Sequence, residues 1–193
     1  MASMSVSNGE RYVVRSVRAD EWSAVRELRL AALRDPAASI AFLETYENAE
    51  ARPDSYWKER TEGAAEGADR AQQIVAEGPD GGWVGSLTVL VEEAGTTDWA
   101  GFPVERRQGH LVGVFMRPEH RGCGLTELLF DEALEWSWRQ GLERVRLIVH
   151  EENGRAQAFY RRIGFAPSGV TVPLDSQPGA LEHEFVIEKS SDR

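Results

Sequence analysis

The stretch Val112–Phe130, VGVFMRPEHRGCGLTELLF, constrains fold and function more than any other part of this chain. It begins as an apolar strand, turns at Arg117, passes through Gly122 and Gly124, and enters a helix whose apolar residues start at Leu125. Backbone N–H groups at the start of a helix have no intrahelical acceptor, and the helix dipole adds partial positive charge there. The stretch therefore predicts an anion-binding turn, in which glycines let a phosphate approach the backbone closely.

The same glycine spacing also occurs in tight turns that bind nothing, so the motif needs support from elsewhere in the chain. The glycine-rich dinucleotide fingerprint and the Gly-Lys-Ser/Thr phosphate loop are both absent. Nicotinamide and nucleoside triphosphate ligands consequently lose their main sequence signal.

Composition sets further limits on the class of protein. A chain of 193 residues suits one domain, and we assign residues 11–190 to it after a flexible tail at 1–10. The net charge of −10 argues against non-specific nucleic-acid binding. The single cysteine, Cys123, excludes an internal disulfide and a cysteine-cluster metal site, and no histidine and carboxylate set has metal-ligand spacing. No apolar run approaches 18 residues and no signal core is visible, so the expected location is cytoplasmic, without membrane insertion.

Hydrophobic periodicity predicts one α+β domain without internal repeats. The expected elements before residue 94 are a strand at Tyr12–Arg18, a helix capped by Asp20 and ended by Pro36, a short helix around Tyr56–Arg60, and a hairpin of strands Gln72–Glu77 and Trp83–Glu92. The later ones are a strand at His110–Met116, a helix from Leu125 to Gly141, a strand at Arg144–His150, a helix from Asn153 to Gly164, and strands from Phe165 and over Leu181–Ile187.

The loop at 94–108 is longer than most connections in a compact domain, and such loops are often functional. Its Trp99 and Phe102 are equally compatible with lining a pocket and with covering the core.

Two spaced motifs in this order of elements resemble the GCN5-related N-acetyltransferase (GNAT) superfamily. The coenzyme A motif of that family is matched by Arg121, Gly124 and, imperfectly, Thr126, where a smaller residue is usual. The second motif is Asn153-x-x-Ala156-x-x-Phe159-Tyr160-x-x-x-Gly164-Phe165. The resemblance implies an α+β fold with a mixed, mostly antiparallel sheet of six to seven strands, strands four and five splayed apart, and about four flanking helices.

The resemblance also implies a binding site for acetyl-CoA as co-substrate. Its pyrophosphate would be held by the N–H groups of Gly122, Cys123, Gly124, Thr126 and Glu127, with Arg121 as countercharge. Its pantetheine arm would pair with the backbone edge of Val114, Phe115 and Met116, and Asn153 would hydrogen-bond the same arm besides capping its helix.

For catalysis, the resemblance implies Tyr160 as the general acid for the departing thiolate, because a phenol is protonated at neutral pH. His110 is the candidate general base; Glu92 or Glu93 acting through a water, and His150, are competitors. A structural role remains the alternative for each of them. Cys123 lies under the expected pyrophosphate, too far from the acetyl group to act as a nucleophile.

The resulting hypothesis is an N-acetyltransferase that passes the acetyl group directly to an amine, either a small molecule or a peptide or protein amine. The alternative is a non-catalytic acyl-CoA sensor or interaction module of the same fold. The acceptor is expected between residues 37–60, 94–108 and 173–180, and neither nucleic acid nor membrane is an expected partner. A homodimer stays open.

Overall fold

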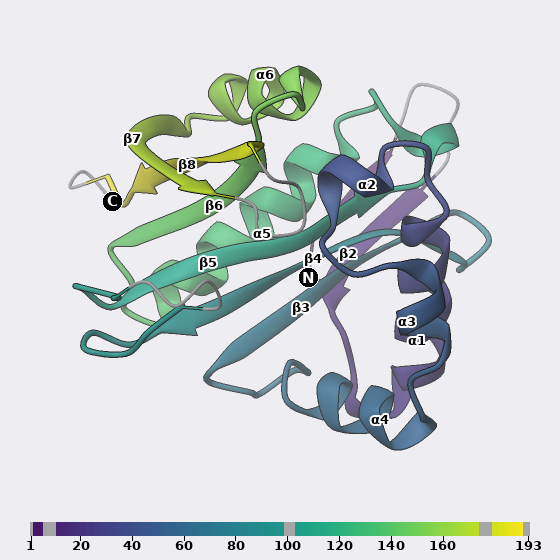
Figure 1. Cartoon of the computed structure of the whole chain (residues 1–193). Helices are drawn as coiled ribbons and strands as arrows, with labels where there is room; N and C mark the ends of the chain where they lie inside the picture. The colour runs from purple at the N-terminus through teal and green to yellow at the C-terminus, as the bar shows by residue number, and fades with distance from the viewer. Residues whose placement is uncertain (1, 6–10, 99–102, 174–178, 191–193) are drawn as a thin grey trace.

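The computed structural model describes residues 2–5, 11–98, 103–173 and 179–190. This part of the chain forms eight strands and six α-helices (Figure 1). The strands are β1 (Ala2–Ser5), β2 (Arg11–Ser16), β3 (Ala71–Glu77), β4 (Trp83–Glu92), β5 (Gln108–Met116), β6 (Arg144–His150), β7 (Ala166–Pro173) and β8 (Leu181–Glu188). The helices are α1 (Trp22–Leu33), α2 (Ala38–Ala41), α3 (Tyr46–Glu50), α4 (Asp54–Glu62), α5 (Leu125–Arg139) and α6 (Gly154–Arg162).

The strands form one mixed sheet in the order β1-β2-β3-β4-β5-β6-β8-β7. All neighbouring pairs are antiparallel except β5 and β6, which are parallel and joined through α5. The α+β class and the mostly antiparallel sheet are confirmed. The described residues hold more strands and helices than the six to seven strands and about four helices expected.

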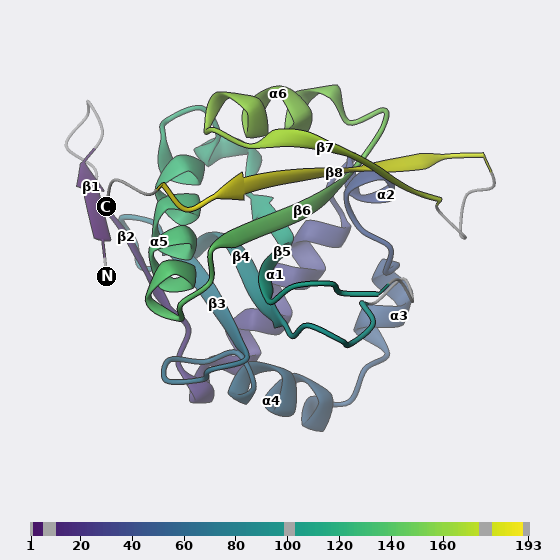
Figure 2. The same cartoon turned by 90° about the vertical axis from the view of Figure 1, so that its left-hand side faces the viewer.

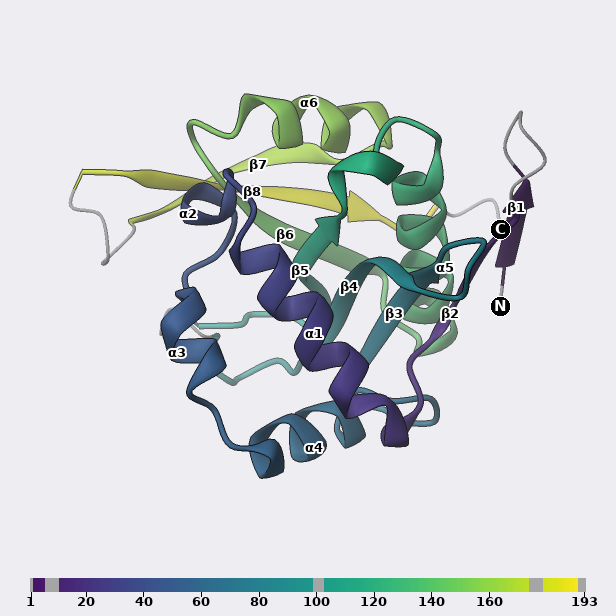
Figure 3. The same cartoon turned by 90° about the vertical axis from the view of Figure 1, so that its right-hand side faces the viewer.

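Helices cover both faces of the sheet, and each face has its own hydrophobic core. Figure 3 shows α1 crossing in front of the central strands with α5 behind them. The core on the α5 face includes Leu87, Leu129 and Phe130, all at most 1% exposed. Burying such a side chain contributes roughly 1.5–3 kcal/mol relative to exposure. The opposite face packs Val25 of α1 and Trp57 of α4 against the sheet.

Side-chain alternation on β6 decides which residues face which core. Val145, Leu147 and Val149 point to the core beneath α5 and α6. Arg146 and His150 consequently point to the face that carries α1 and α2. Figure 2 shows α6 lying along β7 and β8, at one end of the sheet.

Two local predictions differ from the structure. Asp20 does not cap α1; it lies inside a 3-10 turn at Ala19–Glu21, and the helix begins at Trp22. Within the segment 1–10, assigned to a tail, Ala2–Ser5 pair antiparallel with β2. Short polar sequences like this one carry little periodicity, so the pairing depends on the neighbouring strand edge. Trp99 and Phe102 lie outside the described residues.

Candidate active site

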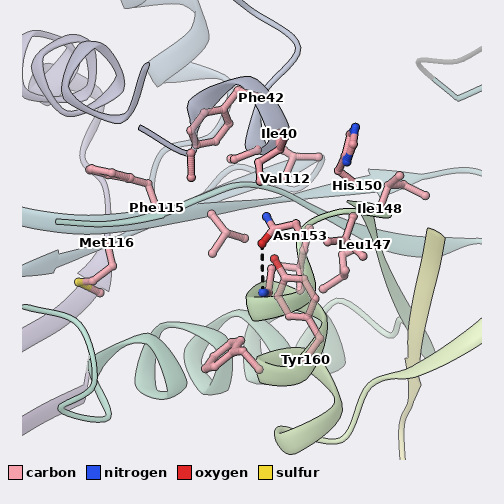
Figure 4. A pocket seen from close by; sticks show the side chains of 18 of the residues that line it. Ile40, Phe42, Val112, Phe115, Met116, Leu147, Ile148, His150, Asn153 and Tyr160 are labelled. Atoms are coloured by element: carbon pink, nitrogen blue, oxygen red, sulfur yellow. Dashed lines mark hydrogen bonds between the residues drawn. The ribbon is translucent and has the colours of Figure 1, made fainter. Parts of the chain in front are cut away.

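An opening in the sheet between β5 and β6 forms the centre of the site. The two strands pair only from Gly109 to Leu111 and from Val145 to Leu147. Beyond these residues a cavity of about 810 Å³ lies between the strand ends, α2 and α6 (Figure 4). This volume falls in the range of small-molecule sites, about 300–1,000 Å³. β5 and β6 are the fourth and fifth strands of the sequence prediction, and their expected splaying is confirmed.

A bulge in β5 accompanies the divergence. Ser86 pairs with Phe115 and Thr88 with Val112, so that one residue of β4 faces two residues of β5. One of the two is Gly113, whose φ of +65° is accessible to glycine at little cost. The bulge turns β5 after Val112, which leaves its edge toward β6 without a partner strand.

The glycine turn places a helix start at one end of the cavity. Gly122 and Gly124 have φ values of +78° and +87°, and Gly124 is the N-cap of α5. None of the backbone N–H groups of residues 122–127 has a hydrogen-bond acceptor among the described residues. Free N–H groups at the start of a 15-residue helix suit a phosphate.

Arg121 is held differently from the free countercharge expected. Its Nη2 lies 2.5 Å from Asp35 Oδ2, and its Nε donates to the carbonyl oxygen of Met116 at 2.8 Å. The guanidinium is thus partly neutralised and fixed in orientation. A second cation, Arg155, lines the cavity and was missed, although it lies two residues after Asn153 within the second motif.

Tyr160 comes from α6 and is 8% exposed. Its hydroxyl makes no hydrogen bond with a described residue, and burial raises its pKa to about 12. Figure 4 shows it beside Asn153 at the lower side of the opening. Asn153 Oδ1 accepts from the N–H of Ala156 at 3.2 Å, so the helix cap predicted for Asn153 is present.

His110 and Glu92 form a hydrogen-bonded pair on the opposite face of the sheet. His110 is 2% exposed, and its Nδ1 donates to Glu92 Oε1 at 2.8 Å. The neutral ring then keeps a lone pair on Nε2, which makes no hydrogen bond with a described residue. His110 also lines the cavity.

The Glu92 carboxylate is occupied by hydrogen bonds within the fold. Besides His110, its carboxylate accepts from Gln108 and twice from Arg146. Burial alone raises the pKa of the Glu92 carboxyl, but the hydrogen bonds from His110 and Arg146 outweigh burial and lower that pKa to about 2. A carboxylate this weakly basic is poorly suited to accept a proton, even through a water. Glu93 pairs instead with Arg107 at 3.1 Å.

The cavity brings together most of the predicted residues. Those lining it are His110, Val114, Phe115, Met116, Arg121, Gly122, Thr126, Glu127, Asn153 and Tyr160. Glu92, Cys123 and Gly124 do not line it. The Cys123 thiol donates to the carbonyl oxygen of His120 at 3.2 Å, away from the reaction centre expected near Tyr160.

Two further polar residues line the same cavity: Glu182, which was not predicted, and His150, which was expected only as a competing base. His150 ends β6 and Glu182 lies opposite it on β8, and each has a buried polar atom without a partner among the described residues. A histidine at the end of an apolar strand was a visible signal. Glu182 gave none, because its pairing with β6 is a tertiary contact.

A split sheet of this order, with a glycine turn and free helix N-terminus beside the opening, defines an acyltransferase type of α+β fold. Residues 22–165 match the Acetyltransferase (GNAT) family, and the chain belongs to that family.

Individual relatives are distant. The chain is 32% identical over 97 residues to mycothiol acetyltransferase from Beutenbergia cavernae, which covers 50% of this chain and 29% of that protein. It is 27% identical over 82 residues to a putative ribosomal protein bS18-alanine N-acetyltransferase from Bacillus subtilis, covering 42% and 54%. The chain thus spans about half or less of these relatives' lengths.

Among solved structures, the fold is similar to PaiA N-acetyltransferase from Thermoplasma acidophilum, which was solved in complex with coenzyme A. The TM-score is 0.65 at 16% identity, with 90% of this chain and 97% of that chain covered.

Two other features, a metal site and a membrane-spanning helix, are absent from the described residues. No group of three or more histidine, cysteine, aspartate or glutamate side chains there has the arrangement of a metal site. No helix in the same residues combines the length and apolar character needed to cross a membrane.

Proposed function

We propose that this protein is an acetyl-CoA-dependent N-acetyltransferase that passes the acetyl group directly to an amine in a ternary complex. One observation carries the proposal: a single cavity connects the free N–H groups at the start of α5 with Tyr160 on one side of the sheet and His110 on the other. A phosphate-bearing donor and a separate acceptor could therefore reach the same part of the cavity from opposite sides of the sheet.

The donor side contains groups that suit coenzyme A. The N–H groups of residues 122–127 would bind the pyrophosphate, and Arg155 offers positive charge at the cavity wall. The unpaired edge of β5 beyond Leu111 would pair with the amide groups of the pantetheine arm. Arg121 would contribute once its contact with Asp35 is exchanged for a phosphate. The coenzyme A bound to the PaiA relative supports this assignment by similarity of fold.

His110 would act as the base. Its Nε2 accepts a proton from the acceptor ammonium, while Glu92 stabilises the imidazolium through Nδ1. The resulting neutral nitrogen attacks the thioester carbonyl carbon, a C–N bond forms, and the C–S bond breaks with its electron pair on sulfur.

Tyr160 would act on the leaving group. Its pKa of about 12 exceeds that of an ordinary thiol, about 8.5, so complete proton transfer to the thiolate is unfavourable by about 5 kcal/mol. We therefore assign most of its effect to a hydrogen bond that it donates to the developing thiolate. As the amide forms, the attacking nitrogen loses its second proton, which reaches the thiolate through solvent to give the coenzyme A thiol, and the protonated His110 returns the first proton to solvent.

Acceptor-dependent release of coenzyme A tests this function. The purified protein is incubated with acetyl-CoA and a panel of primary amines, aminoamides and peptides, and thiol release is followed over background hydrolysis. A rise in melting temperature with acetyl-CoA checks donor binding separately. Donor binding without release for any acceptor would favour the non-catalytic acyl-CoA module and refute the enzyme.

A further inference from the structure

His150 and Glu182 form a second polar pair on the acceptor side of the opening. They are register partners on the antiparallel strands β6 and β8. Figure 4 shows His150 on the same side of the strands as Ile40 and Val112, opposite Tyr160. The proposed mechanism assigns neither residue a role.

Each residue has one buried atom with unused hydrogen-bonding capacity. His150 is 3% exposed, and its Nε2 has no partner among the residues that the structure describes. Glu182 Oε2 is likewise buried without a partner in the described part of the chain, and both residues line the cavity. Leaving such groups unpaired is unfavourable, so unpaired polar atoms of side chains that line a cavity are candidates for contact with a ligand.

The backbone fixes which nitrogen of His150 carries the proton. The N–H of Glu152 donates to His150 Nδ1 at 3.1 Å, so Nδ1 must be the acceptor. The proton of the neutral ring therefore lies on Nε2, the buried atom without a hydrogen-bond partner among the described residues. His150 in this arrangement is a hydrogen-bond donor toward the ligand, which separates it from His110, whose free Nε2 is an acceptor.

Glu182 supplies the complementary group. An ionised carboxylate oxygen accepts hydrogen bonds only, and Oε2 has none. Burial raises the pKa of the Glu182 carboxyl. Arg29, Arg60 and Glu44 also line the cavity, and Arg29 and Glu44 pair with each other at 3.1 Å.

We propose that His150 and Glu182 recognise an amide group next to the reacting amine, with Nε2–H donating to its carbonyl oxygen and Oε2 accepting from its N–H. This inference rests on the proposed acetyltransferase function and narrows its acceptor to α-aminoamides, such as amino-acid amides and peptide N-termini. A simple alkylamine offers neither of the two complementary groups.

Two matched acceptors test the proposal on the unmodified protein. L-Alaninamide has the N–H that Glu182 would bind; L-alanine N,N-dimethylamide lacks it, while the reacting amine of the two compounds has a similar basicity. We expect kcat/KM for coenzyme A release to be roughly 10- to 100-fold higher with alaninamide, since a site built for a hydrogen bond rejects the analogue that lacks it. 1,2-Dimethylpropylamine, an isostere without the amide, should be poorer still when rates are compared per neutral amine.

Variants connect this preference to the two residues. Glu182→Leu should lower kcat/KM for alaninamide at least tenfold and leave the dimethylamide nearly unchanged, which removes the discrimination. His150→Leu should lower kcat/KM for both amides, because both keep the carbonyl oxygen. Glu188→Leu and His183→Leu are the matched controls, because both residues lie on β8, the strand of Glu182, and do not line the cavity. Melting temperature and acetyl-CoA affinity report whether each variant is folded and binds the donor.

The possible failures are distinguishable. No coenzyme A release with any amine, despite acetyl-CoA binding, would refute the proposed function. Equal kcat/KM for the two amides in the unmodified protein would refute this inference and leave the function intact. Variants that lose stability without a change in acceptor preference would show that His150 and Glu182 have a structural role only. This outcome would also overturn the inference. The comparison of the two amides on the unmodified protein tests the inference even if Glu182→Leu fails to fold.

Discussion

Glu92 on β4 and Arg146 on β6 meet across the intervening strand β5 through two hydrogen bonds, Nε to Oε2 at 2.9 Å and Nη2 to Oε1 at 2.8 Å. Arg146 also contacts Asp98 at 2.9 Å and Glu184 at 3.1 Å. This cluster ties four parts of the chain together beside the point where the sheet opens. It also fixes the carboxylate that orients His110.

Replacing Glu92 by Gln should destabilise the fold by on the order of 3 kcal/mol at pH 7, since it leaves Arg146 buried with one partner fewer. The folded pKa of Glu92, about 2, lies below its ordinary value of 4.5. Its contribution is therefore present above about pH 4.5 and is lost as pH falls toward 2. Urea unfolding at pH 7 and pH 3 should show the gap between the two proteins shrinking in acid.

The exposed pair of Arg106 and Glu188 supplies the control for this experiment. Glu188→Gln should change stability by less than about 1 kcal/mol, because solvent screens the pair. An equal loss in the two variants would contradict the structural role assigned to Glu92.

His110→Gln should lower kcat by roughly 100-fold at neutral pH if His110 is the base. The defect should shrink as pH approaches the pKa of the acceptor amine, because the amine then arrives already neutral. Rates for both proteins are measured between pH 6.5 and 9.5 with one acceptor. A defect that stays constant over this range would assign His110 to positioning rather than to proton removal.

Tyr160→Phe should lower kcat by about 100-fold with little change in acetyl-CoA affinity, since one hydrogen bond to a developing charge is lost. Tyr46→Phe is the matched control because Tyr46 lies outside the cavity and hydrogen-bonds Glu50. Thiol release gives the rate, and isothermal titration gives the affinity. An unchanged kcat in Tyr160→Phe would remove Tyr160 from the mechanism.

Gly122→Ala should weaken coenzyme A binding at least tenfold, because its Cβ would lie where the phosphate approaches the turn. Gly141 provides a close match: its φ is +74° against +78° for Gly122, and an added Cβ meets nothing within 4 Å at either position. Both substitutions should cost about 1–2 kcal/mol of stability through left-handed strain. Only Gly122→Ala should affect binding, and equal affinities for the two variants would exclude the turn as the phosphate site.

Local chemistry made several features readable in advance. The strand Arg144–His150 has the predicted limits, and the cap at Asn153 and the stop near Gly164 follow from short-range hydrogen bonding and glycine conformation. The glycine turn before α5 likewise needs only a few consecutive residues. For this reason the fold and the glycine turn at the cavity were predictable from residue pattern and family resemblance together.

The acceptor side depended on contacts between residues far apart in the chain. Glu92 looked like a candidate base until Arg146, 54 residues later, was found to occupy its carboxylate. Glu182 gained significance only when β8 paired with β6 and placed it opposite His150. The sequence alone determined the turn before α5 and the cap at Asn153, because these require only neighbouring residues. Tertiary structure decided which charges are neutralised and which stay open to a ligand, because burial and pairing arise only when distant strands meet.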